Sequence, residues 1–261
     1  MQARETLAVA GATGRVGRHV VDILEGRGYD VVAISRSNGV DLVSGDGLAD
    51  ALAGVDCVID TATGVSPEQE AATAFFTAAA RNLHTAGGHA GVQRMVVVSI
   101  IGCDRFSAGY NAAKVAHERA MLSGPIPVRI LRAAQFHELV AQLVEWGRQP
   151  GEVSYVPEMR TQLVAARTVA EALADLATGS ESAHVARSPA VMIPEIAGPR
   201  EEDIIEMARM LVSYRGDPVR IEGVSDPADP DRDLYQTSGL LPGPDATLAG
   251  PTFEEWLDAT S

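Results

Sequence analysis

One stretch near the N-terminus, residues 7–17, constrains the fold of this chain more than any other. It reads LAVAGATGRVG, so an apolar run leads directly into three glycines spaced as G-x-x-G-x-x-G, and an amphipathic segment (16–24) follows. A strand, a tight turn and a helix start in this order are typical of a dinucleotide site, because the free N–H groups and the positive dipole end of the helix face the phosphates. The alternative interpretation is a structural turn between a strand and a helix.

Each glycine has its own expected role in this turn. Gly11 lets the chain turn sharply, Gly14 lets the backbone approach a pyrophosphate, and Gly17 lets the helix pack closely on the strand. The spacing differs from the G-x-G-x-x-G of the commoner dehydrogenases. The cofactor contacts predicted in this turn are Gly11, Thr13, Gly14, Arg15, Val16 and Gly17.

Strand and helix patterns alternate from this turn to about residue 132. Apolar runs predict strands over 30–35, 57–62, 93–99 and 127–131, with a brief strand at 41–42. Helices are predicted over 45–52, 67–85, 110–122 and 135–146, and the glycines at 87, 88 and 91 are expected to end the second of them. The alternation predicts an α/β fold, a Rossmann-type doubly wound parallel sheet.

The pattern loosens after residue 132. Strands are predicted at 162–165, 191–196 and 219–222, and helices at 168–177, 200–213 and 253–257, within a proline-rich tail. We expect an NAD(P)-binding Rossmann core over 1–132 and a smaller C-terminal substrate-side lobe over 133–261. The lobe is expected to be partly integrated with the core, so that the chain could also count as one domain.

Ligands of doubly wound sheets lie beyond the carboxyl ends of the strands, which points to residues 11–17, 35–41, 61–66, 99–110 and 132–138. Thr61 and Ala62 are therefore predicted to contact the cofactor. The predicted substrate pocket consists of Ile100, Gln135, Phe136 and His137. His137 could relay a proton near neutral pH, or it is simply a polar residue at a helix start.

Composition excludes several classes of function. With 261 residues and 46% hydrophobic content, the chain can bury a substantial core. It has 21 basic and 35 acidic residues, a net charge of −14 and no basic block, so neither nucleic acid nor an anionic membrane is an expected partner. No apolar run reaches the ~20 residues of a membrane span. We expect a cytoplasmic monomer or homodimer that acts on a small-molecule substrate.

The cysteines and histidines predict no metal site. Cys57 and Cys103 have no paired spacing, and they are expected to be reduced, without a disulfide. The histidines without metal-ligand spacing are His84, His89, His117 and His184.

The end of the second strand favours NADP(H) as the cofactor. NAD enzymes usually carry Asp or Glu there, whereas this chain has Ser35 and Arg36, with a second arginine, Arg15, in the glycine turn. Guanidinium groups bind a phosphate bidentately, which suits the 2′-phosphate of NADP. Asp41 could reach the adenine edge. The alternative is that both arginines are solvated surface residues and Asp41 is a turn residue.

A tyrosine and a lysine form a candidate catalytic pair. Lys114 is the only lysine of the chain, and it follows Tyr110 by four residues, so the two share one helix face. An ammonium group near a phenol favours the phenolate, and we expect Lys114 to lower the Tyr110 pKa for proton transfer and to hold the nicotinamide ribose. A surface helix pair is the alternative.

Together these features resemble the atypical short-chain dehydrogenase/reductases of the NmrA-like NAD(P)-binding group. The resemblance is carried by the glycine motif, Ser99 at a strand end, the Tyr110/Lys114 pair, and residues 131–136 and 195–199. It extends over nearly the whole chain and is specific mainly over residues 6–137. It implies a nicotinamide cofactor, with Tyr110, Lys114 and Ser99 as catalytic residues.

The sequence departs from this family at one catalytic position. Typical members place a serine, which orients the substrate carbonyl, one or two residues beyond Ser99, where this chain has Ile100 and Ile101. Ser99 itself or Ser107 would have to supply that hydroxyl. NmrA-like relatives include reductases and cofactor sensors without turnover, so the resemblance leaves this choice open.

We therefore expect an NADPH-dependent reductase of a small carbonyl or conjugated compound, in which Tyr110 supplies the proton and Lys114 lowers its pKa. The first alternative is a redox sensor that binds NADP(H) and a protein partner without chemistry. A weaker alternative is a nucleotide-sugar epimerase or dehydratase. That activity would call for more basic residues in 133–261, which has only scattered arginines.

Overall fold

The computed structural model describes residues 5–179 and 193–260, which form two compact units. The first unit holds the described residues up to Ser99, Gly109–Arg132, and the described part of Val169–Pro194. The second holds Ile100–Ala108, Ala133–Thr168 and the described residues from Glu195 onward. One boundary coincides with the division expected at residue 132, but residues 100–108 group with the later part of the chain.

The strands are β1 (Thr6–Ala10), β2 (Asp30–Ile34), β3 (Cys57–Asp60), β4 (Arg94–Ile100), β5 (Val128–Ala133), β6 (Arg148–Gln149), β7 (Val153–Pro157), β8 (Arg160–Thr161), β9 (Glu195–Ala197), β10 (Glu202–Asp203), β11 (Arg220–Val224) and β12 (Thr247–Leu248). The helices are α1 (Gly17–Gly26), α2 (Leu48–Ala51), α3 (Gln69–Ala90), α4 (Gly109–Leu122), α5 (His137–Trp146), α6 (Ala166–Thr178), α7 (Ile204–Tyr214), α8 (Arg232–Gln236) and α9 (Phe253–Ala259).

The main sheet confirms the predicted fold. Among the described residues it has seven strands in the order β12-β9-β5-β4-β3-β1-β2, and the registers of β1 with β2, β1 with β3, and β3 with β4 are parallel. From the β2 edge, the order is 2-1-3-4-5, that of a doubly wound sheet. The order reverses between β1 and β3, which is where such sheets bind ligands.

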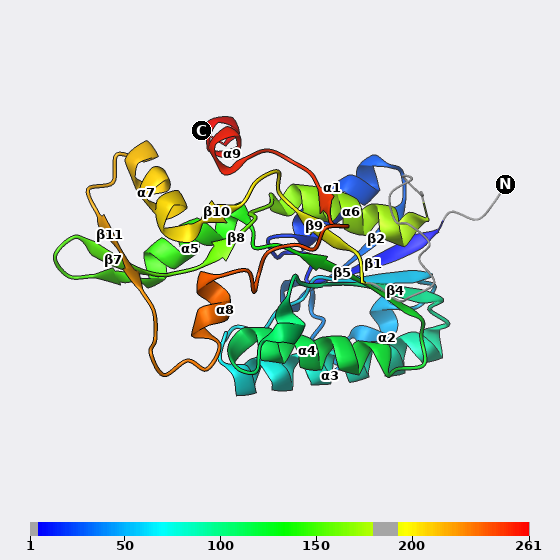
Figure 1. Cartoon of the computed structure of the whole chain (residues 1–261). Coiled ribbons are helices and arrows are strands. Elements are labelled where there is room, and N and C mark those ends of the chain that lie inside the picture. Colours follow the sequence, from blue (N-terminus) through cyan, green and yellow to red (C-terminus); the bar gives the residue numbers. More distant parts are fainter. Residues whose placement is uncertain (1–4, 180–192, 261) are drawn as a thin grey trace. The chain divides into compact units, whose positions relative to one another are not determined.

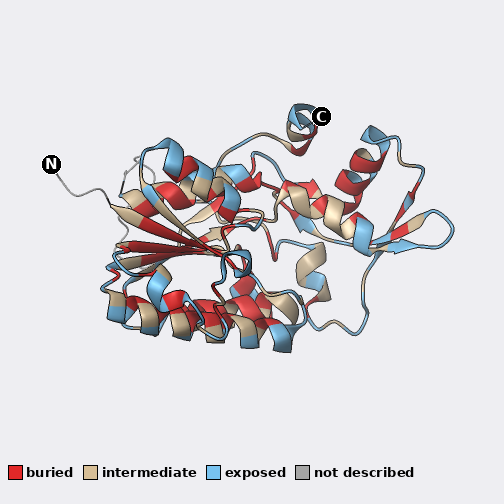
Figure 2. Ribbon diagram, turned by 180° about the vertical axis from the view of Figure 1, so that it is seen from behind, coloured by how far each residue is buried: buried red, intermediate tan, exposed pale blue. Residues whose placement is uncertain are grey.

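The first unit has three layers. Helices α3 and α4 lie side by side on one face of the sheet, and α1 and α6 cover the other face (Figure 1). Strands β1, β3 and β4 consist mostly of Ala, Val, Leu and Ile, without the polar alternation of a half-exposed strand, and they are almost wholly buried (Figure 2). The apolar helix faces and the strands together form the core of this unit.

Helix α3 is longer than predicted because two of its glycines do not end it. The helix continues through Gly87 and Gly88, and it ends at Gly91, whose φ of +82° is left-handed. Gly87 is buried, and a Cβ on it would lie 3.0 Å from Cδ1 of Ile126. Close packing explains the glycine there, whereas a Cβ on Gly88 would meet nothing within 4 Å among the described residues.

The second unit has its own core and small sheets. Strands β11, β7 and β6 form a sheet in that order, with β11 parallel and β6 antiparallel to β7, while β8 pairs with β10. Helices α5 and α7 pack on β7. The buried core of this unit includes Val140, Val156, Ile204, Leu211 and Phe253. The proline-rich tail also contains α8, which the sequence did not predict.

Three further predictions differ from the structure. Residues 41–42 lie in a turn, and 162–165 make only an isolated bridge between Val164 and Phe136. Helix α7 starts later than predicted because Glu202–Asp203 pair as β10 and the Asp203 carboxylate caps the helix. The strand predicted at 191–196 is described only from residue 193, and β9 forms its end; residues 191–192 lie outside the described part.

Both cysteines are buried and free of disulfides. Among the described residues, none of the helices combines the length and hydropathy that a membrane-spanning segment needs.

Candidate functional site

The glycine turn joins β1 to α1 as predicted. Gly11 has a left-handed φ of +76°, and a Cβ there would lie 2.8 Å from Cα of Ala62. A Cβ on Gly17 would overlap the carbonyl oxygen of Gly11, so close packing of the helix on the turn requires both glycines. Gly14 is exposed, and apart from its chain neighbours, that carbonyl oxygen is the only described atom within 4 Å of a Cβ built on it. The outer side of the turn is therefore open.

The turn lies against the ends of both neighbouring strands. The Gly11 N–H donates to the carbonyl of Ile34, the last residue of β2, at 3.0 Å. The N–H and the hydroxyl of Thr61, which follows β3, both donate to the carbonyl of Ala10, at 3.0 and 2.8 Å. The structure thus brings Thr61 and Ala62 together with the glycine turn, at the point where the strand order reverses.

The residues predicted to select NADP follow β2 directly. Ser35 is buried and its hydroxyl pairs with that of Ser37 at 2.8 Å. Arg36 begins a short 3₁₀ turn and is exposed, and Arg15 is half-buried in the glycine turn. Because Gly11 bonds to the end of β2, both arginines belong to the loops at this one edge of the sheet.

Three other predicted cofactor contacts differ in exposure and in role. Thr13 is exposed, whereas Val16 is buried ahead of α1. The Asp41 carboxylate accepts the N–H groups of Val43 and Ser44 at 2.6 and 3.1 Å. That oxygen stabilises the local turn, in line with the interpretation of Asp41 as a turn residue.

Tyr110 lies in the first turn of α4, with its hydroxyl 2.8 Å from that of Thr63. Burial raises the Tyr110 pKa, the Thr63 hydrogen bond partly offsets this, and the negative charge of Asp60 raises it further. The predicted lowering of this pKa by Lys114 is therefore wrong. Burial and the charge of Asp60 set the direction of the shift, and the Lys114 ammonium group is hydrogen-bonded to other partners.

Those partners lie inside the first unit. Lys114 is only 5% exposed, and its Nζ donates to the carbonyl of Val98 on β4 at 2.9 Å. The same Nζ lies 2.9 Å from Nδ1 of His117, whose Nε2 lies 3.1 Å from Oδ2 of Asp60 at the end of β3. The ammonium is thus held at the carboxyl end of the sheet rather than in bulk solvent.

The imidazole of His117 is a neutral ring between the negative charge of Asp60 and the positive charge of Lys114. Burial opposes ionisation of Asp60, but the hydrogen bond and charge of His117, the N–H of Ala62 and the charge of Lys114 together hold its pKa below the usual range. Burial, and then the Lys114 charge, lower the pKa of His117, while Asp60 partly offsets them. At neutral pH the imidazole is therefore uncharged.

The ring of Phe76 on α3 contacts His117, Lys114 and Tyr110. Its ring stacks on that of His117 at 4.5 Å, lies 4.5 Å from Nζ of Lys114, and meets Tyr110 edge-on at 5.8 Å. Asp60, Thr63 and Phe76 are not predicted from the sequence as site residues, and the sequence offers His117 only as a possible metal ligand. One signal was present, because His117 lies three residues after Lys114 on the same helix face.

The serine candidates have different surroundings. Ser99 on β4 is 3% exposed, and Ile100, which follows it, is half-buried. The N–H and hydroxyl of Ser107 donate to the carboxylate of Asp231 at 2.7 and 2.9 Å, and the Ala108 N–H donates to it at 2.8 Å. The Ser107 hydroxyl therefore holds a loop of the second unit, which favours Ser99 as the hydroxyl source.

Gln135 and Phe136 are half-buried in the second unit. The Gln135 side chain accepts a hydrogen bond from the hydroxyl of Thr161. Its backbone carbonyl accepts the Val164 N–H at 3.0 Å, and Phe136 forms the isolated bridge with Val164. These contacts link the start of α5 to the strand-like segment before α6.

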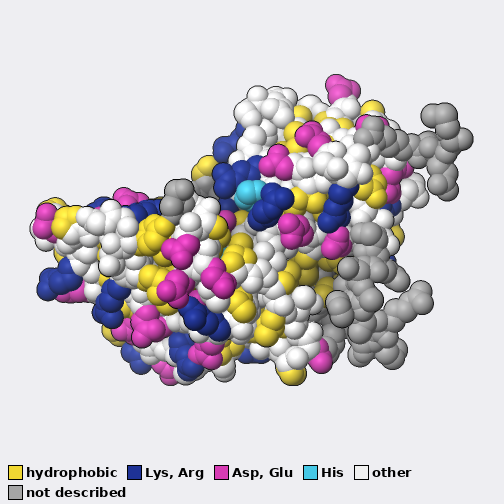
Figure 3. Space-filling model, turned by 90° about the horizontal axis from the view of Figure 1, so that it is seen from above, with side chains coloured by type: hydrophobic (Ala, Val, Ile, Leu, Met, Phe, Trp, Pro, Cys, Tyr) yellow, Lys and Arg dark blue, Asp and Glu magenta, His cyan; other side chains and the backbone are white. Residues whose placement is uncertain are grey.

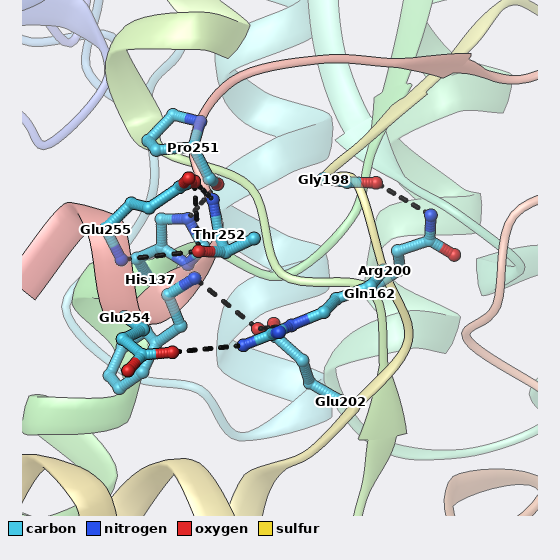
Figure 4. Close-up of polar contacts among 10 residues, drawn as sticks. His137, Gln162, Gly198, Arg200, Glu202, Pro251, Thr252, Glu254 and Glu255 are labelled. Atoms are coloured by element: carbon cyan, nitrogen blue, oxygen red, sulfur yellow. Dashed lines mark hydrogen bonds and ion pairs between the residues drawn. The ribbon is translucent and has the colours of Figure 1, made fainter.

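His137 is part of a packed core instead of a proton relay. It is fully buried, with its ring against Phe253 and Trp256 of α9. Its Nε2 lies 3.1 Å from the Pro251 carbonyl oxygen (Figure 4). Burial lowers its pKa to about 4. The prediction of proton relay near neutrality is wrong, because a ring enclosed by apolar side chains disfavours the charged form.

The charged surface has both signs. Because Lys114 is buried, the exposed basic side chains are arginines, and on the face in Figure 3 they are interspersed with carboxylates and gather beside a histidine. Within the described residues, no three His, Cys, Asp or Glu side chains are placed to hold a metal ion. His184 lies outside the described residues.

Solved structures with this fold include proteins that hold NAD or NADP. A short-chain dehydrogenase/reductase superfamily protein from Agrobacterium tumefaciens with bound NAD is 18% identical, with a TM-score of 0.65 over 98% of this chain and 95% of that one. The dTDP-4-dehydrorhamnose reductase of Bacillus anthracis in complex with NADP is 16% identical, with a TM-score of 0.65 over 98% of each chain. A GDP-6-OMe-4-keto-L-xylo-heptose reductase from C. jejuni is 13% identical, with a TM-score of 0.66 over 100% and 99%. At these identities the likeness shows the fold.

No curated protein matches the chain in sequence. A family model described as NAD(P)H-binding, however, matches residues 11–178, which include the glycine turn, Tyr110 and Lys114. The chain therefore belongs to the NAD(P)H-binding family.

Proposed function

We propose that this chain is an NADP(H)-dependent oxidoreductase of the short-chain dehydrogenase/reductase type that reduces a small carbonyl or conjugated substrate. The proposal rests on one series of contacts. Gly11 of the glycine turn packs against Ala62, and the next residue, Thr63, forms a hydrogen bond with the hydroxyl of Tyr110. The turn that suits a diphosphate and the phenol that suits proton transfer are thus neighbours on one edge of one sheet.

The residues present fit a dinucleotide. The open outer side of Gly14 and the start of α1 suit the diphosphate, because a helix N-terminus offers free N–H groups and a positive dipole end. Arg15 and Arg36 would hold the 2′-phosphate of NADP(H). When bound, the nicotinamide supplies the hydride. Tyr110 would donate the proton to the substrate oxygen or carbon, and Ser99 would orient the reacting group.

Tyr110 is protonated at neutral pH, because burial raises its pKa above the ordinary value. The phenol can therefore supply the proton that a reduction needs. Lys114 lies one helix turn from Tyr110, and its ammonium group, held by the Val98 carbonyl and His117, would contact the nicotinamide ribose. We propose a small-molecule substrate and a cytoplasmic monomer or homodimer.

The solved neighbours suggest one substrate class to include in any screen. Two of them are named as reductases of nucleotide-linked keto sugars. A keto sugar attached to a nucleoside diphosphate belongs beside simple ketones, aldehydes and enones in the substrate panel.

A sensor of the NADP(H) redox state is the second candidate. The observation that favours it is the pair Ile100 and Ile101, where typical catalytic relatives carry a serine. A sensor would distinguish oxidised from reduced cofactor but would oxidise no NADPH with any carbonyl compound.

Replacement of Tyr110 tests the catalytic proposal. We expect Tyr110→Phe to lower NADPH oxidation with an accepted substrate by at least about a hundredfold, because general acid catalysis contributes roughly 10²–10⁴. NADPH affinity, measured by calorimetry, should change little. Unchanged turnover in Tyr110→Phe removes this residue from the mechanism. No turnover by the wild type across the whole panel, with NADPH bound, favours the sensor instead.

A further inference from the structure

Lys114, His117 and Asp60 form a buried line of hydrogen bonds that runs from α4 to the end of β3. The histidine and aspartate side chains are each 1% exposed. An ammonium nitrogen can only donate, so Nδ1 of His117 accepts from Lys114, and Nε2 carries the proton that is donated to Asp60. Asp60 therefore selects the ring tautomer that Lys114 requires.

The surroundings leave this line little freedom. The ring of Phe76 from α3 stacks on His117 and lies over Nζ of Lys114. The Val98 carbonyl from β4 accepts from the same Nζ. The other charged or titratable groups that act on the line are Glu118, whose charge acts on His117, and Tyr110, on which the charge of Asp60 acts.

We propose that His117 and Asp60 are positioning residues for the reaction proposed above: Asp60 orients the ring of His117, and His117 fixes the ammonium of Lys114 one helix turn from Tyr110. A lysine side chain has four rotatable methylene links and loses rotamer entropy when it is fixed. Because the line is already ordered by contacts on three elements, cofactor binding need not order the ammonium. This role rests on the proposed function.

Asp60→Asn separates this role from simple packing. The amide is isosteric with the carboxylate, and its oxygen can still accept the Ala62 N–H, which Oδ1 of Asp60 accepts at 2.9 Å. Its NH2 group, however, would face Nε2 of His117 and force the ring proton onto Nδ1. That proton would then point at the ammonium of Lys114, so the variant breaks the line while it preserves the shape of the site. His117→Phe is the second variant, because it keeps the stack on Phe76 and removes the acceptor.

The single lysine allows a direct readout. Protein labelled with ¹³C at lysine Cε gives one side-chain signal, that of Lys114, whose midpoint can be followed in a pH titration without cofactor. In Asp60→Asn we expect the midpoint to move to lower pH by roughly one unit, because the variant removes a negative charge from the line and turns a ring N–H toward the ammonium, and both changes disfavour the charged form of Lys114. His117→Phe should shift it in the same direction. His84→Asn is the matched control, since His84 is buried in the same unit and bonds to the Met121 carbonyl.

NADPH affinity of the same variants, measured by calorimetry at pH 7, connects the line to the proposed function. We expect both variants to bind NADPH at least about tenfold more weakly than the wild type and the control, as for the loss of one hydrogen bond to a charged group. If the lysine midpoint is unchanged in both variants while the wild-type protein binds NADPH, this inference alone is overturned. If the midpoint shifts but the wild-type protein binds no NADPH, the proposed function is overturned, and this role with it.

Discussion

At the scale of single residues, two buried histidines connect protonation to stability. His117 in the first unit bridges Lys114 and Asp60, and His137 in the second bonds to the Pro251 carbonyl. Burial is the main reason that the pKa of each ring lies below its usual value. Both rings are neutral in the folded protein, and acid must therefore favour the unfolded chain, in which they take up protons freely.

His137 gives this effect a defined pH window. Its folded pKa is about 4 against an ordinary value of 6.5, so the unfolded chain binds the additional proton between these pH values. From this side chain alone, we expect the free energy of unfolding to fall by about 1.4 kcal/mol per pH unit as the pH decreases through that window. Urea unfolding of the wild type and His137→Gln at several pH values measures it, and the variant should show the shallower slope.

The control for this experiment is His89→Gln. His89 is exposed in the last turn of α3, so its replacement removes a histidine without disturbing a buried core. Parallel slopes for the wild type and His137→Gln would contradict the assignment of a depressed pKa to His137.

That Tyr110 and Lys114 lie one turn apart on a single helix could be predicted, because helix spacing and the scarcity of lysine are visible in the sequence. The hydrogen-bond partners of the two side chains could not. Asp60 and His117 are 57 positions apart, and only the fold brings them together. Likewise, the burial of His137 could not be predicted from its place at the start of a helix. It depends on the packing of α9 against the ring, which comes from a distant part of the sequence.

At the scale of elements, α3 shows how glycines of one helix differ. Gly91 adopts a left-handed conformation at the end, Gly87 allows close packing, and Gly88 is exposed with space around it. Sequence alone places all three near a helix end and predicts a break at the first. The distinction depends on Ile126, which comes from another part of the chain and fills the space beside Gly87.

The two interior glycines therefore give opposite predictions. Gly88→Ala should raise the free energy of unfolding by about 0.5–1 kcal/mol, because alanine is the better helix former. Gly87→Ala should be neutral or destabilising, because its Cβ would lie 3.0 Å from Ile126 and 3.4 Å from Met95. Urea denaturation of both variants compares them directly. An equal gain in stability at both positions would show that the Gly87 contact is unimportant.

At the scale of the whole molecule, strand–helix alternation was enough to predict the parallel sheet and the edge at which the glycine turn meets Thr61 and Ala62. The second unit was less predictable, because β6, β8 and β10 have only two residues each and β7 had no clear apolar alternation. The second unit is also built from separate segments of the sequence, since residues 100–108 group with segments far later in the chain. Periodicity cannot detect an element held mainly by distant partners.

The central claim is that the first unit binds an NADP(H) dinucleotide at the glycine turn, and calorimetric titration of the wild-type protein with NADPH, NADP, NADH and NAD tests it most directly. Binding of NADPH and NADP is predicted, with NADH and NAD at least about tenfold weaker, because Arg15 and Arg36 would lose charged hydrogen bonds to the 2′-phosphate. Tighter binding of NADH and NAD would contradict the role of the arginines. No heat of binding from any of the four, in a sample shown to be folded, would contradict the account as a whole.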